Sequence, residues 1–340
     1  MASAITLFTH LKIPLEEIVK ATNNFDDVYV IGGGGFGKVY RGQLLVSGKM
    51  VNIAARRFDG NHRRQGDVEF WTEITMLSSL KHENIVSLVG FCDENGEKII
   101  INKDEATRGS LSMYLSDPTT LTWIQRLKIC VGVARALRCI HNGEGGRSDS
   151  VIHRNINSST VLLDAEFEAK LSGFEYSIKQ SVNRMGRVVL SEAVGTKGYM
   201  DPSILKTGGV SHKSDIFSFG VVLCEVLCGR KAFIPNHVDN RFLAPLFRVH
   251  YENNGSLNHI IHPDLRVQMS RQSLTRFSRV AYSCLENRLH RPEMNEIVIE
   301  LEKSLELQQQ LGNMCSGCRG GDNNSGGDDG NCGVDGGDDI

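Results

Sequence analysis

The chain has 340 residues, which corresponds to one large domain or two small ones. Hydrophobic residues make up 40% of it and charged residues 23%, so a sizeable core is expected and wholesale disorder is excluded. The 38 basic and 40 acidic residues nearly cancel, which argues against a nucleic-acid-binding protein. No apolar run approaches the ~18–20 residues that span a bilayer, and the N-terminus shows no signal peptide.

The first part of the chain is expected to be rich in β-strands. Short runs typical of strands occupy residues 28–31, 37–41, 50–58, 85–91 and 98–103. Residues 69–80 have helical spacing instead, because one stripe contains Phe70, Ile74, Leu77 and Leu80. The sequence therefore predicts a small sheet with one helix.

The following part of the chain is expected to be mainly helical. Thr122 and Gln125 form a capping-box pattern that opens a long helix. Residues 216–227 are apolar on nearly every side, which predicts a buried central helix. Two further helices are predicted at residues 274–285 and 294–311. A small strand-rich lobe followed by a larger helical lobe is the predicted architecture.

Gly312 is expected to end the last helix, and residues 312–340 are mostly Gly, Asp and Asn. With almost nothing to bury, this stretch is predicted to be a disordered acidic tail with a net charge of about −5. Cys315 and Cys318 have metal-ligand spacing, but a zinc site needs a second ligand pair, which Cys332 alone does not supply. We interpret the nine cysteines of the chain as free thiols in a reducing compartment.

A glycine cluster provides the first functional motif. Gly32, Gly34 and Gly37 match the pattern G-x-G-x-x-G. A dinucleotide-binding site would require a helix directly after the glycines, whereas the residues that follow Gly37 are typical of a strand. The alternative is the loop that covers the phosphates of ATP in protein kinases. A glycine-rich hairpin with no ligand is also compatible with this motif alone.

Further motifs follow along the chain. They include Glu-Phe-Trp-Thr-Glu-Ile at 69–74, His-Glu-Asn-Ile-Val at 82–86, Val-Ile-His-Arg at 151–154, Gly-Thr-Lys-Gly-Tyr-Met-Asp-Pro at 195–202, Lys-Ser-Asp-Ile-Phe-Ser-Phe-Gly at 213–220 and Arg-Pro at 291–292. With these motifs the sequence resembles the kinase domain of plant receptor-like kinases, of the FERONIA type and the receptor-like cytoplasmic groups, from about residue 13 to residue 307.

This resemblance implies an α+β fold, the two-lobed fold of protein kinases. Residues 1–24 are then a lead-in segment, and residues 25–308 form the kinase-like domain. Its N-lobe covers about residues 25–103 and its C-lobe about residues 109–308. The acidic tail lies outside this domain.

Phosphoryl transfer in this fold needs a lysine on the third strand, a helix glutamate that holds it, a catalytic aspartate and two metal ligands. The lysine position reads Arg56 here, or Arg57 if the register shifts by one. Arginine keeps the charge but presents a broad planar fork. Glu73 matches the helix glutamate, so a Glu73–Arg56 pair is expected. Lys38 is not expected to substitute, because strand alternation points it away from the face of Val39.

The catalytic loop departs from the family pattern at three positions. His153 and Arg154 match it, but Asn155 occupies the position of the aspartate base. A neutral amide does not accept the proton of a substrate hydroxyl. Asn157 replaces the loop lysine, and Thr160 replaces the metal-binding asparagine.

The second metal-binding motif of the family, Asp-Phe-Gly, reads Gly173-Phe174-Glu175. Gly173 has no side chain with which to hold Mg²⁺. Glu175 is expected to help little, because its carboxylate would have to turn back past Phe174. With the lysine, the base and both metal ligands replaced, no metal site is expected, and the sequence predicts a pseudokinase.

The nucleotide pocket is implied by the resemblance. Its positions are Ile31, Gly32, Gly34, Gly37, Val39, Ala54, Arg56, Lys103 and Leu162. Lys103 is expected at the border of the adenine pocket, where a lysine would either fill the pocket or meet a phosphate. ATP bound without Mg²⁺ is the cofactor that these positions permit.

Other positions match the scaffold of the family. The internal stack that joins the lobes is expected to consist of Leu77, Leu88, His153 and Phe174, with Asp215 as its anchor. The acid that pairs with Arg291 in the family falls at Ser203, so Arg291 is expected to lack that partner.

The sequence favours a catalytically inactive scaffold, decoy or allosteric partner of active receptor-like kinases or other signalling proteins. An ATP-binding switch and a weakly active Ser/Thr kinase are the alternatives. The chain is also a candidate phosphorylation substrate, with Arg154 as the partner of the phosphate and with hydroxyls at Ser177, Ser181, Ser191 and Thr196. We expect no nucleic acid, no direct membrane span, and a cytoplasmic location with recruitment to the plasma membrane through a partner.

Overall fold

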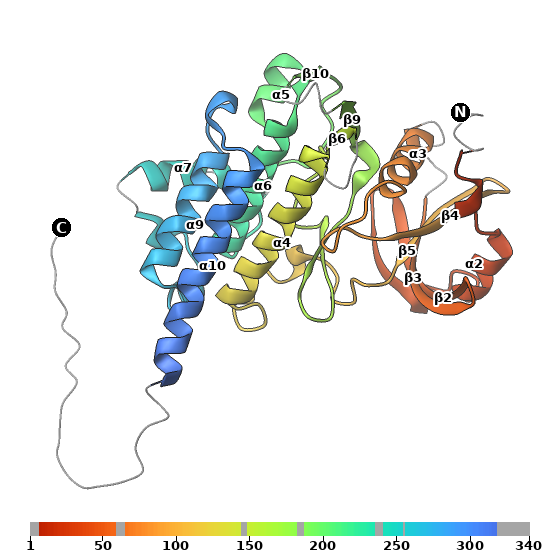
Figure 1. Ribbon diagram of the computed structural model, residues 1–340, viewed down its shortest axis with the longest axis horizontal. Helices are drawn as coiled ribbons and strands as arrows, with labels where there is room; N and C mark the ends of the chain where they lie inside the picture. The colour runs from red at the N-terminus through yellow and green to blue at the C-terminus, as the bar shows by residue number, and fades with distance from the viewer. Residues whose placement is uncertain are drawn as a thin grey trace, which may run out of the picture.

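The computed structural model describes residues 7–58, 65–143, 148–181, 187–234, 241–253 and 256–317, which form two lobes (Figure 1). The smaller N-lobe, drawn in red and orange, contains a five-stranded sheet in the order β1-β2-β3-β5-β4. The strands are all antiparallel to their neighbours, and their bounds are β1 (Val30–Gly34), β2 (Gly37–Val46), β3 (Lys49–Arg57), β4 (Leu88–Glu94) and β5 (Glu97–Lys103). The predicted strand-rich lobe is confirmed.

Helix α3 (Gln65–Leu77) covers one face of this sheet. Its Phe70 and Ile74 are fully buried with Phe91 of β4 and Ile100 of β5. The helix begins before the predicted position, but the predicted apolar stripe is the buried one. Glu73 lies at the edge of this apolar stripe, so the same packing buries its side chain in the interior of the lobe.

Two strands begin later than the sequence predicts. Residues 27–29 form a 3-10 turn, η2 (Asp27–Tyr29), because the Asp26 side chain accepts a hydrogen bond from the amide of Val28. The strand expected at residues 85–91 begins only at Leu88.

The register of β2 and β3 is continuous from Lys38 to Val46 and therefore fixes which side chains share a face.

The segment expected as a lead-in contributes to the core of the N-lobe. After the 3-10 turn η1 (Thr9–Leu11), helix α2 (Leu15–Ala21) packs on the outer face of the sheet. Its Ile18 is fully buried against Ile53 and Ile101. The helix approaches so closely that a Cβ at Gly42 would lie 2.5 Å from the carbonyl oxygen of Ala21. The apolar outer face of the sheet is thus covered by residues that precede the predicted boundary.

Helix α6 (His212–Cys228) lies at the centre of the larger C-lobe, and nearly all of its residues are buried, as the sequence predicts. Helices α4 (Trp123–Asn142) and α9 (Arg271–Cys284) pack against it, and α10 (Met294–Gly317) packs against α4 and α9 (Figure 1). The capping box predicted at the start of α4 is confirmed, and the amide of Thr122 donates to the Gln125 side chain at 2.9 Å.

Short elements complete the C-lobe. The helices are α5 (Pro202–Thr207), α7 (Leu243–Glu252) and α8 (Pro263–Arg266), and the 3-10 turns are η4 (Leu111–Met113), η5 (Phe174–Tyr176), η7 (Ser256–His259) and η8 (Arg288–His290). Three two-stranded sheets are formed by β6 (Asp149–Ile152) with β9 (Ile178–Ser181), β7 (Val161–Leu163) with β8 (Ala169–Leu171), and β10 (Val189–Leu190) with β11 (Gly209–Val210). The loops between these elements carry the candidate site.

The last helix does not end at Gly312. Helix α10 continues to Gly317, because a single glycine inside a helix costs only about 1 kcal/mol and the residues before it, 305–311, are good helix formers. Within the expected tail, residues 318–340, including Cys318 and Cys332, lie outside the described residues.

Arg291 has an acidic partner, contrary to expectation. Its two terminal nitrogens donate to the Asp201 carboxylate at 2.6 and 3.1 Å, and both side chains are almost completely buried. Burial opposes ionisation of Asp201, but the hydrogen bonds and charge of Arg291 outweigh it and hold the pKa of that carboxyl below its usual value. Asp201 also caps α5 by accepting from the amide of Ser203. The carboxylate partner of Arg291 is therefore supplied two residues before the expected position, Ser203.

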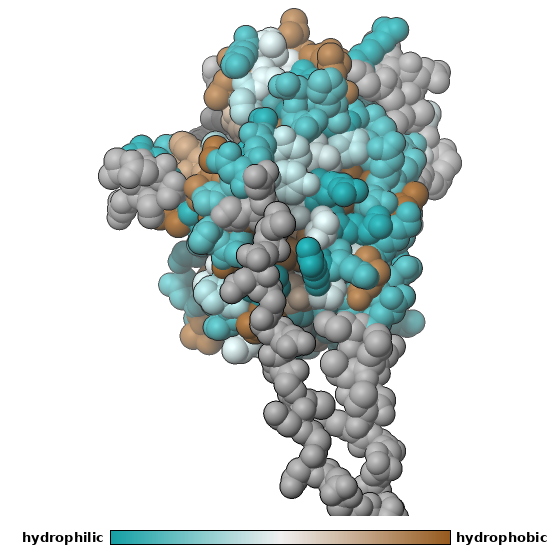
Figure 2. All heavy atoms as spheres, turned by 90° about the vertical axis from the view of Figure 1, so that its left-hand side faces the viewer, coloured by the Kyte–Doolittle hydropathy of each residue, from teal (hydrophilic) through white to brown (hydrophobic). Residues whose placement is uncertain are grey.

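The surface of the C-lobe end opposite the N-lobe is mostly hydrophilic, and its apolar residues are scattered (Figure 2). No helix in the described ranges is long and apolar enough to cross a membrane. The described cysteines of the core are buried and form no disulfide, as expected, at Cys92, Cys130, Cys139, Cys224, Cys228 and Cys284.

Candidate functional site

Strand alternation places Val39, Ala54 and Arg56 on one face of the N-lobe sheet. In the register of the strands, Val39 is opposite Arg56, and Ala54 is opposite Asn102. Arg56 reaches from this face to Glu175 of the C-lobe, so the face lines the cleft between the lobes. The residues expected on the nucleotide side of β2 and β3 are thus brought together.

Lys103 lies on the opposite face of β5. It is paired with Ile53, whose side chain packs under α2 on the outer side of the sheet. The Lys103 side chain is 50% exposed and lies 3.9 Å from Glu105. Asn102, opposite Ala54, lies on the face that lines the cleft instead. Lys103 is therefore not on the expected face, because the period of two along a strand sends neighbouring side chains to opposite faces.

Arg56 forms the ion pair that the sequence predicts with Glu73 of α3. Only 2% of the Glu73 side chain is exposed. The alternative register is excluded, since Arg57 points to the other face and donates to Glu97 at 2.6 and 2.7 Å. Lys38 pairs with an exposed aspartate outside the cleft, so it does not substitute for the missing lysine.

Glu175 enters the cleft, contrary to expectation. Its Oε1 accepts from Nδ2 of Asn155 at 2.8 Å, and its Oε2 lies 3.9 Å from a terminal nitrogen of Arg56. Burial lowers the pKa of Arg56, and the charge of Glu175 opposes that shift. The reason is local geometry: Gly173 adopts a left-handed conformation (φ +85°), and the 3-10 turn η5 then rotates Glu175 toward the catalytic loop.

Asn155, at the position of the catalytic base, is held by hydrogen bonds at both ends of its amide. Its Nδ2 donates to Glu175, while its Oδ1 accepts from Oγ1 of Thr196 at 2.9 Å and from Nδ2 of Asn157 at 3.1 Å. An amide oxygen has only two good acceptor positions. The side chain therefore has neither the basicity nor a free acceptor with which to take a hydroxyl proton.

Asn157 and Thr160 stabilise the turn of the catalytic loop. The Oδ1 of Asn157 accepts from the amides of Ser159 and Thr160 at 2.8 and 3.2 Å. The hydroxyl of Thr160 donates to the carbonyl oxygen of Asn155 at 3.0 Å. The Thr160 hydroxyl and the Oδ1 of Asn157 are thus committed to the backbone of their own loop, while Nδ2 of Asn157 also donates to the side chains of Asn155 and Thr196.

Gly173 and Thr160, which replace the two metal ligands, pack against each other. A Cβ at Gly173 would lie 2.6 Å from Cγ2 of Thr160. The Thr160 methyl group has little freedom to move, because its hydroxyl is fixed by the hydrogen bond to Asn155. The space next to Gly173 is therefore filled by a methyl group.

The internal stack between the lobes is assembled as expected. His153 and Phe174 are in edge-to-face contact with ring centroids 4.6 Å apart, and Leu77 and Leu88 belong to or pack on the same apolar cluster. Asp215 accepts from the amides of His153 and Arg154 at 2.7 and 2.8 Å and contacts His141 at 2.9 Å. Burial opposes ionisation of Asp215, yet these hydrogen bonds lower its pKa below the usual value.

The glycine-rich loop folds over the phosphate end of the cleft. Gly32 and Gly34 have open space around them, and the preceding Ile31 is 39% exposed. Gly37, which begins β2, has a left-handed φ of +113°. At the tip, the ring of Phe36 contacts Tyr176, the last residue of η5, with ring centroids 5.5 Å apart. An aromatic contact thus joins the loop to the segment that follows Gly173.

Leu162 lies on β7, half-buried against the core of the C-lobe. It is joined to Ser110, which follows the connection between the lobes, by an isolated bridge. Leu162 therefore lies in the C-lobe next to the connection between the lobes, and its place in the nucleotide pocket stays a prediction.

Negative charge gathers at the phosphate end of the cleft. Glu73 and Glu175 are both buried, and Arg56 is the cation placed between them. Glu69, one turn before Glu73 on α3, is also buried, and its Oε2 has no hydrogen-bond partner within the described part of the chain. Burial, with the charge of Glu175, raises the pKa of Glu69. Even with Glu69 protonated, two carboxylates face one guanidinium.

Comparisons with known proteins agree with this geometry. The sequence profile of the protein tyrosine and serine/threonine kinase family matches residues 27–301. The chain belongs to this family. It is 38% identical to the receptor-like protein kinase HERK 1 of Arabidopsis thaliana over 314 residues, which are 91% of this chain and 36% of that protein. It is 37% identical to FERONIA of the same organism over 298 residues, 86% of this chain and 32% of that protein. The chain thus spans about a third of these relatives.

A kinase domain generally implies binding of ATP and Mg²⁺. The residues of this cleft fit ATP better than they fit Mg²⁺. Small or apolar side chains stand at the adenine positions Val39, Ala54 and Leu162. The metal positions Thr160 and Gly173 offer no carboxylate or amide oxygen, and Mg²⁺ requires oxygen ligands in near-octahedral geometry. Across the described ranges, no group of three or more His, Cys, Asp or Glu side chains could hold a metal ion. The donor set does not fit a kinase metal site.

The contact between Gly173 and Thr160 gives a stability prediction. Gly173→Ala is expected to lower the free energy of unfolding by about 2–4 kcal/mol, because the left-handed φ and the overlap with the Thr160 methyl both disfavour a Cβ. Adding Thr160→Ser removes that methyl and is expected to recover part of the loss. Urea unfolding of the two single variants and the double variant measures the coupling.

The matched control is Gly96→Ala. Gly96 has a similar φ of +80°, but nothing lies within 4 Å of a Cβ there, so only the backbone cost of about 1 kcal/mol is expected. Equal losses at Gly173 and Gly96, with no coupling to Thr160, would contradict the packing described above.

Proposed function

We propose that this member of the kinase family is a pseudokinase, a catalytically inactive scaffold or allosteric partner of active receptor-like kinases. The observation that carries the proposal is the state of Asn155. Its amide is bound by Glu175, Thr196 and Asn157, so the position of the base holds no basic group. General-base catalysis contributes roughly 10²–10⁴ to such a reaction.

The metal positions support the same proposal. In an active kinase, metal ions bridge the β- and γ-phosphates and neutralise the charge that develops on transfer. Here the methyl group of Thr160 occupies the space beside Gly173. The two residues that replace the metal ligands are therefore packed against each other. Restoring the aspartate at Gly173 alone would therefore create a clash with Thr160 instead of a site.

The charge of the cleft favours a scaffold over an ATP-binding switch. The triphosphate of ATP would approach Glu175 and Glu73, with Arg56 already placed between them. Like charges in a partly buried site repel strongly. Among the described residues, no group of three or more His, Cys, Asp or Glu side chains could hold a metal ion to offset the repulsion. ATP bound without Mg²⁺ thus becomes the second candidate for this site.

A weakly active Ser/Thr kinase is the alternative that one observation favours. Glu175 brings a carboxylate into the cleft, 3.9 Å from Arg56. A carboxylate there would be a substitute for the missing aspartate if it turned toward a metal. Its Oε1, however, accepts from Asn155, so it is engaged with the replaced base.

Interaction with active kinases is the role we propose for the intact scaffold. The stack of His153 and Phe174 and the anchor Asp215 hold the two lobes in a defined arrangement without requiring catalysis. Relatives at 37–38% identity are named as receptor-like protein kinases. We propose that such a kinase is the partner, that this chain is cytoplasmic, and that it reaches the plasma membrane through that partner.

The absence of catalysis is directly testable. The purified chain, incubated with Mg²⁺ and ATP labelled on the γ-phosphate, is expected to label neither itself nor a generic protein substrate above a no-enzyme control. Asn155→Asp is expected to remain inactive as well, because the base alone does not supply metal ligands. An active receptor-like kinase domain serves as the positive control.

Robust transfer would contradict the pseudokinase proposal. If Glu175→Gln abolished that transfer, the chain would be a weakly active kinase in which Glu175 is the substitute metal ligand. Transfer that Glu175→Gln left unchanged would point to a contaminating kinase.

Arg154 suggests how a partner kinase could act on this chain. Its terminal nitrogens donate to the carbonyl oxygens of Tyr176 and Glu192, at 3.0 and 2.7 Å. Its Nε is buried and has no partner among the described residues. Among the hydroxyls expected as phosphorylation sites, Ser177 is buried and donates to the backbone carbonyl oxygen of His153. Ser191, by contrast, is partly exposed and is adjacent to Glu192. We propose that Ser191 is phosphorylated and that the phosphate pairs with Arg154.

The prediction concerns phosphorylation-dependent binding. After co-expression with an active receptor-like kinase, phosphate is expected on Ser191, and partner affinity is expected to rise about tenfold through charge-assisted hydrogen bonds. Ser191→Ala and Arg154→Gln should each remove that gain, while the control Ser181→Ala should keep it. Phosphosite mapping and biolayer interferometry measure both. If Ser191 were not phosphorylated, or if these variants did not change the partner affinity, the proposed role of the phosphate would be contradicted. The chain would then be a constitutive scaffold.

A further inference from the structure

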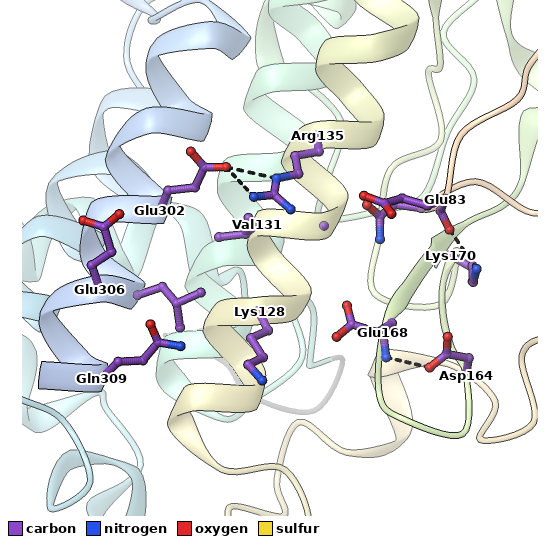
Figure 3. A pocket seen from close by; sticks show the side chains of 13 residues that line it. Glu83, Lys128, Val131, Arg135, Asp164, Glu168, Lys170, Glu302, Glu306 and Gln309 are labelled. Carbon is purple, nitrogen blue, oxygen red and sulfur yellow. Dashed lines mark hydrogen bonds and ion pairs between the residues drawn. The ribbon is translucent and has the colours of Figure 1, made fainter. Parts of the chain in front are cut away.

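A groove of about 710 Å³ opens on the C-lobe (Figure 3). Helix α4 forms its floor with Val131 and Gly132. Helix α10 flanks α4 on one side, and the turn between β7 and β8 flanks it on the other (Figure 3). None of the residues that line this groove belongs to the candidate site between the lobes.

The α10 side of the groove lies beyond the region that defines the family. The kinase profile ends at residue 301, whereas this wall is formed by Glu302, Leu305, Glu306 and Gln309. The groove therefore depends on the extension of α10 toward Gly317. A role for it would be additional to any role of the kinase fold itself.

Some of the charges in the groove are satisfied internally. Arg135 of α4 donates twice to Glu302, at 2.7 and 3.0 Å (Figure 3). Lys170 donates to the carbonyl oxygen of Glu83 at 2.8 Å. Asp164 accepts from the amide of Glu168 at 2.7 Å and so closes the β7–β8 turn. These contacts leave neither Arg135 nor Lys170 free to neutralise further acids.

Three carboxylates of the groove remain unpaired in the described part of the chain. They belong to Glu83, Glu168 and Glu306, one from each side of the groove and one from the loop before β4. Lys128 is the single lining cation without a partner among the described residues. The half-buried Leu305, on the α10 wall, adds an apolar side chain beside these charges. The groove thus offers acceptors at its edges and apolar surface within.

We propose that this groove binds a short basic segment of a partner protein, in which cationic side chains flank an apolar one. The cations would pair with Glu168 on one wall and Glu306 on the other, and the apolar side chain would lie on Leu305. Charge complementarity selects this occupant, because an acidic segment would meet unpaired carboxylates on both walls. The proposal does not rest on the absence of catalysis.

The test uses the full chain and a fluorescein-labelled peptide with a central leucine flanked on each side by two arginines. Fluorescence anisotropy is expected to show binding that weakens with added salt. The triple variant Glu83→Gln, Glu168→Gln and Glu306→Gln is expected to bind roughly tenfold more weakly, since each exposed pair contributes modestly. Hydrogen exchange is expected to slow in α4 and α10 when the peptide binds.

A charge-matched control separates the groove from general attraction to an acidic surface. It carries the same number of neutralised acids on the N-lobe, at Glu16, Glu17 and Asp27, and is expected to bind like the unmodified chain. Melting temperatures verify that both variants fold. Equal weakening in the two triple variants, exchange that slows outside α4 and α10, or no binding up to about 1 mM peptide would overturn the proposal.

Discussion

One guanidinium, that of Arg56, determines the arrangement of the cleft, because it lies between two buried carboxylates. Glu73 comes from the helix of the N-lobe and Glu175 from the turn η5 of the C-lobe, so a single cation links both lobes. Leaving a buried charge without its partner costs about 3–5 kcal/mol, which makes this linkage a strong constraint on the positions of α3 and η5. An active kinase uses a Lys–Glu pair and a metal-bound aspartate at these places. Here a protein carboxylate takes the place beside the cation.

The other replacements are consistent with that linkage. Because Glu175 faces the catalytic loop, Asn155 can donate to it, which an aspartate at the same position could not do without carrying a proton. Because Gly173 has no side chain, the methyl group of Thr160 fills the adjacent space. The residues at these positions therefore support one another in a folded site, which we propose has lost the groups required for transfer. This mutual packing is what we take as the physical basis of the proposed scaffold role.

Sequence reasoning was sufficient wherever a short pattern fixes the geometry. The pairing of Arg56 with Glu73 follows from the alternation of a strand and the stripe of a helix, and the fold follows from many ordered motifs. The entry of Glu175 into the cleft was not predictable in this way, because it depends on a left-handed backbone at the preceding glycine. The partner of Arg291 was missed because Asp201 supplies its carboxylate from two residues away, a distance that only the packing of α5 reveals. Patterns of residue type do not encode such shifts.

Isothermal titration of ATP into the unmodified chain and into Glu175→Gln, with Mg²⁺ and with chelator, tests the central claim most directly. Glutamine keeps the acceptor for Asn155 but removes the charge beside Arg56. If Glu175 and Arg56 close the phosphate end of the cleft, the variant gains affinity for ATP, by roughly tenfold or more, and the gain is independent of Mg²⁺. Tight binding of ATP to the unmodified chain that requires Mg²⁺ and disappears in the variant would contradict the account and make Glu175 a metal ligand.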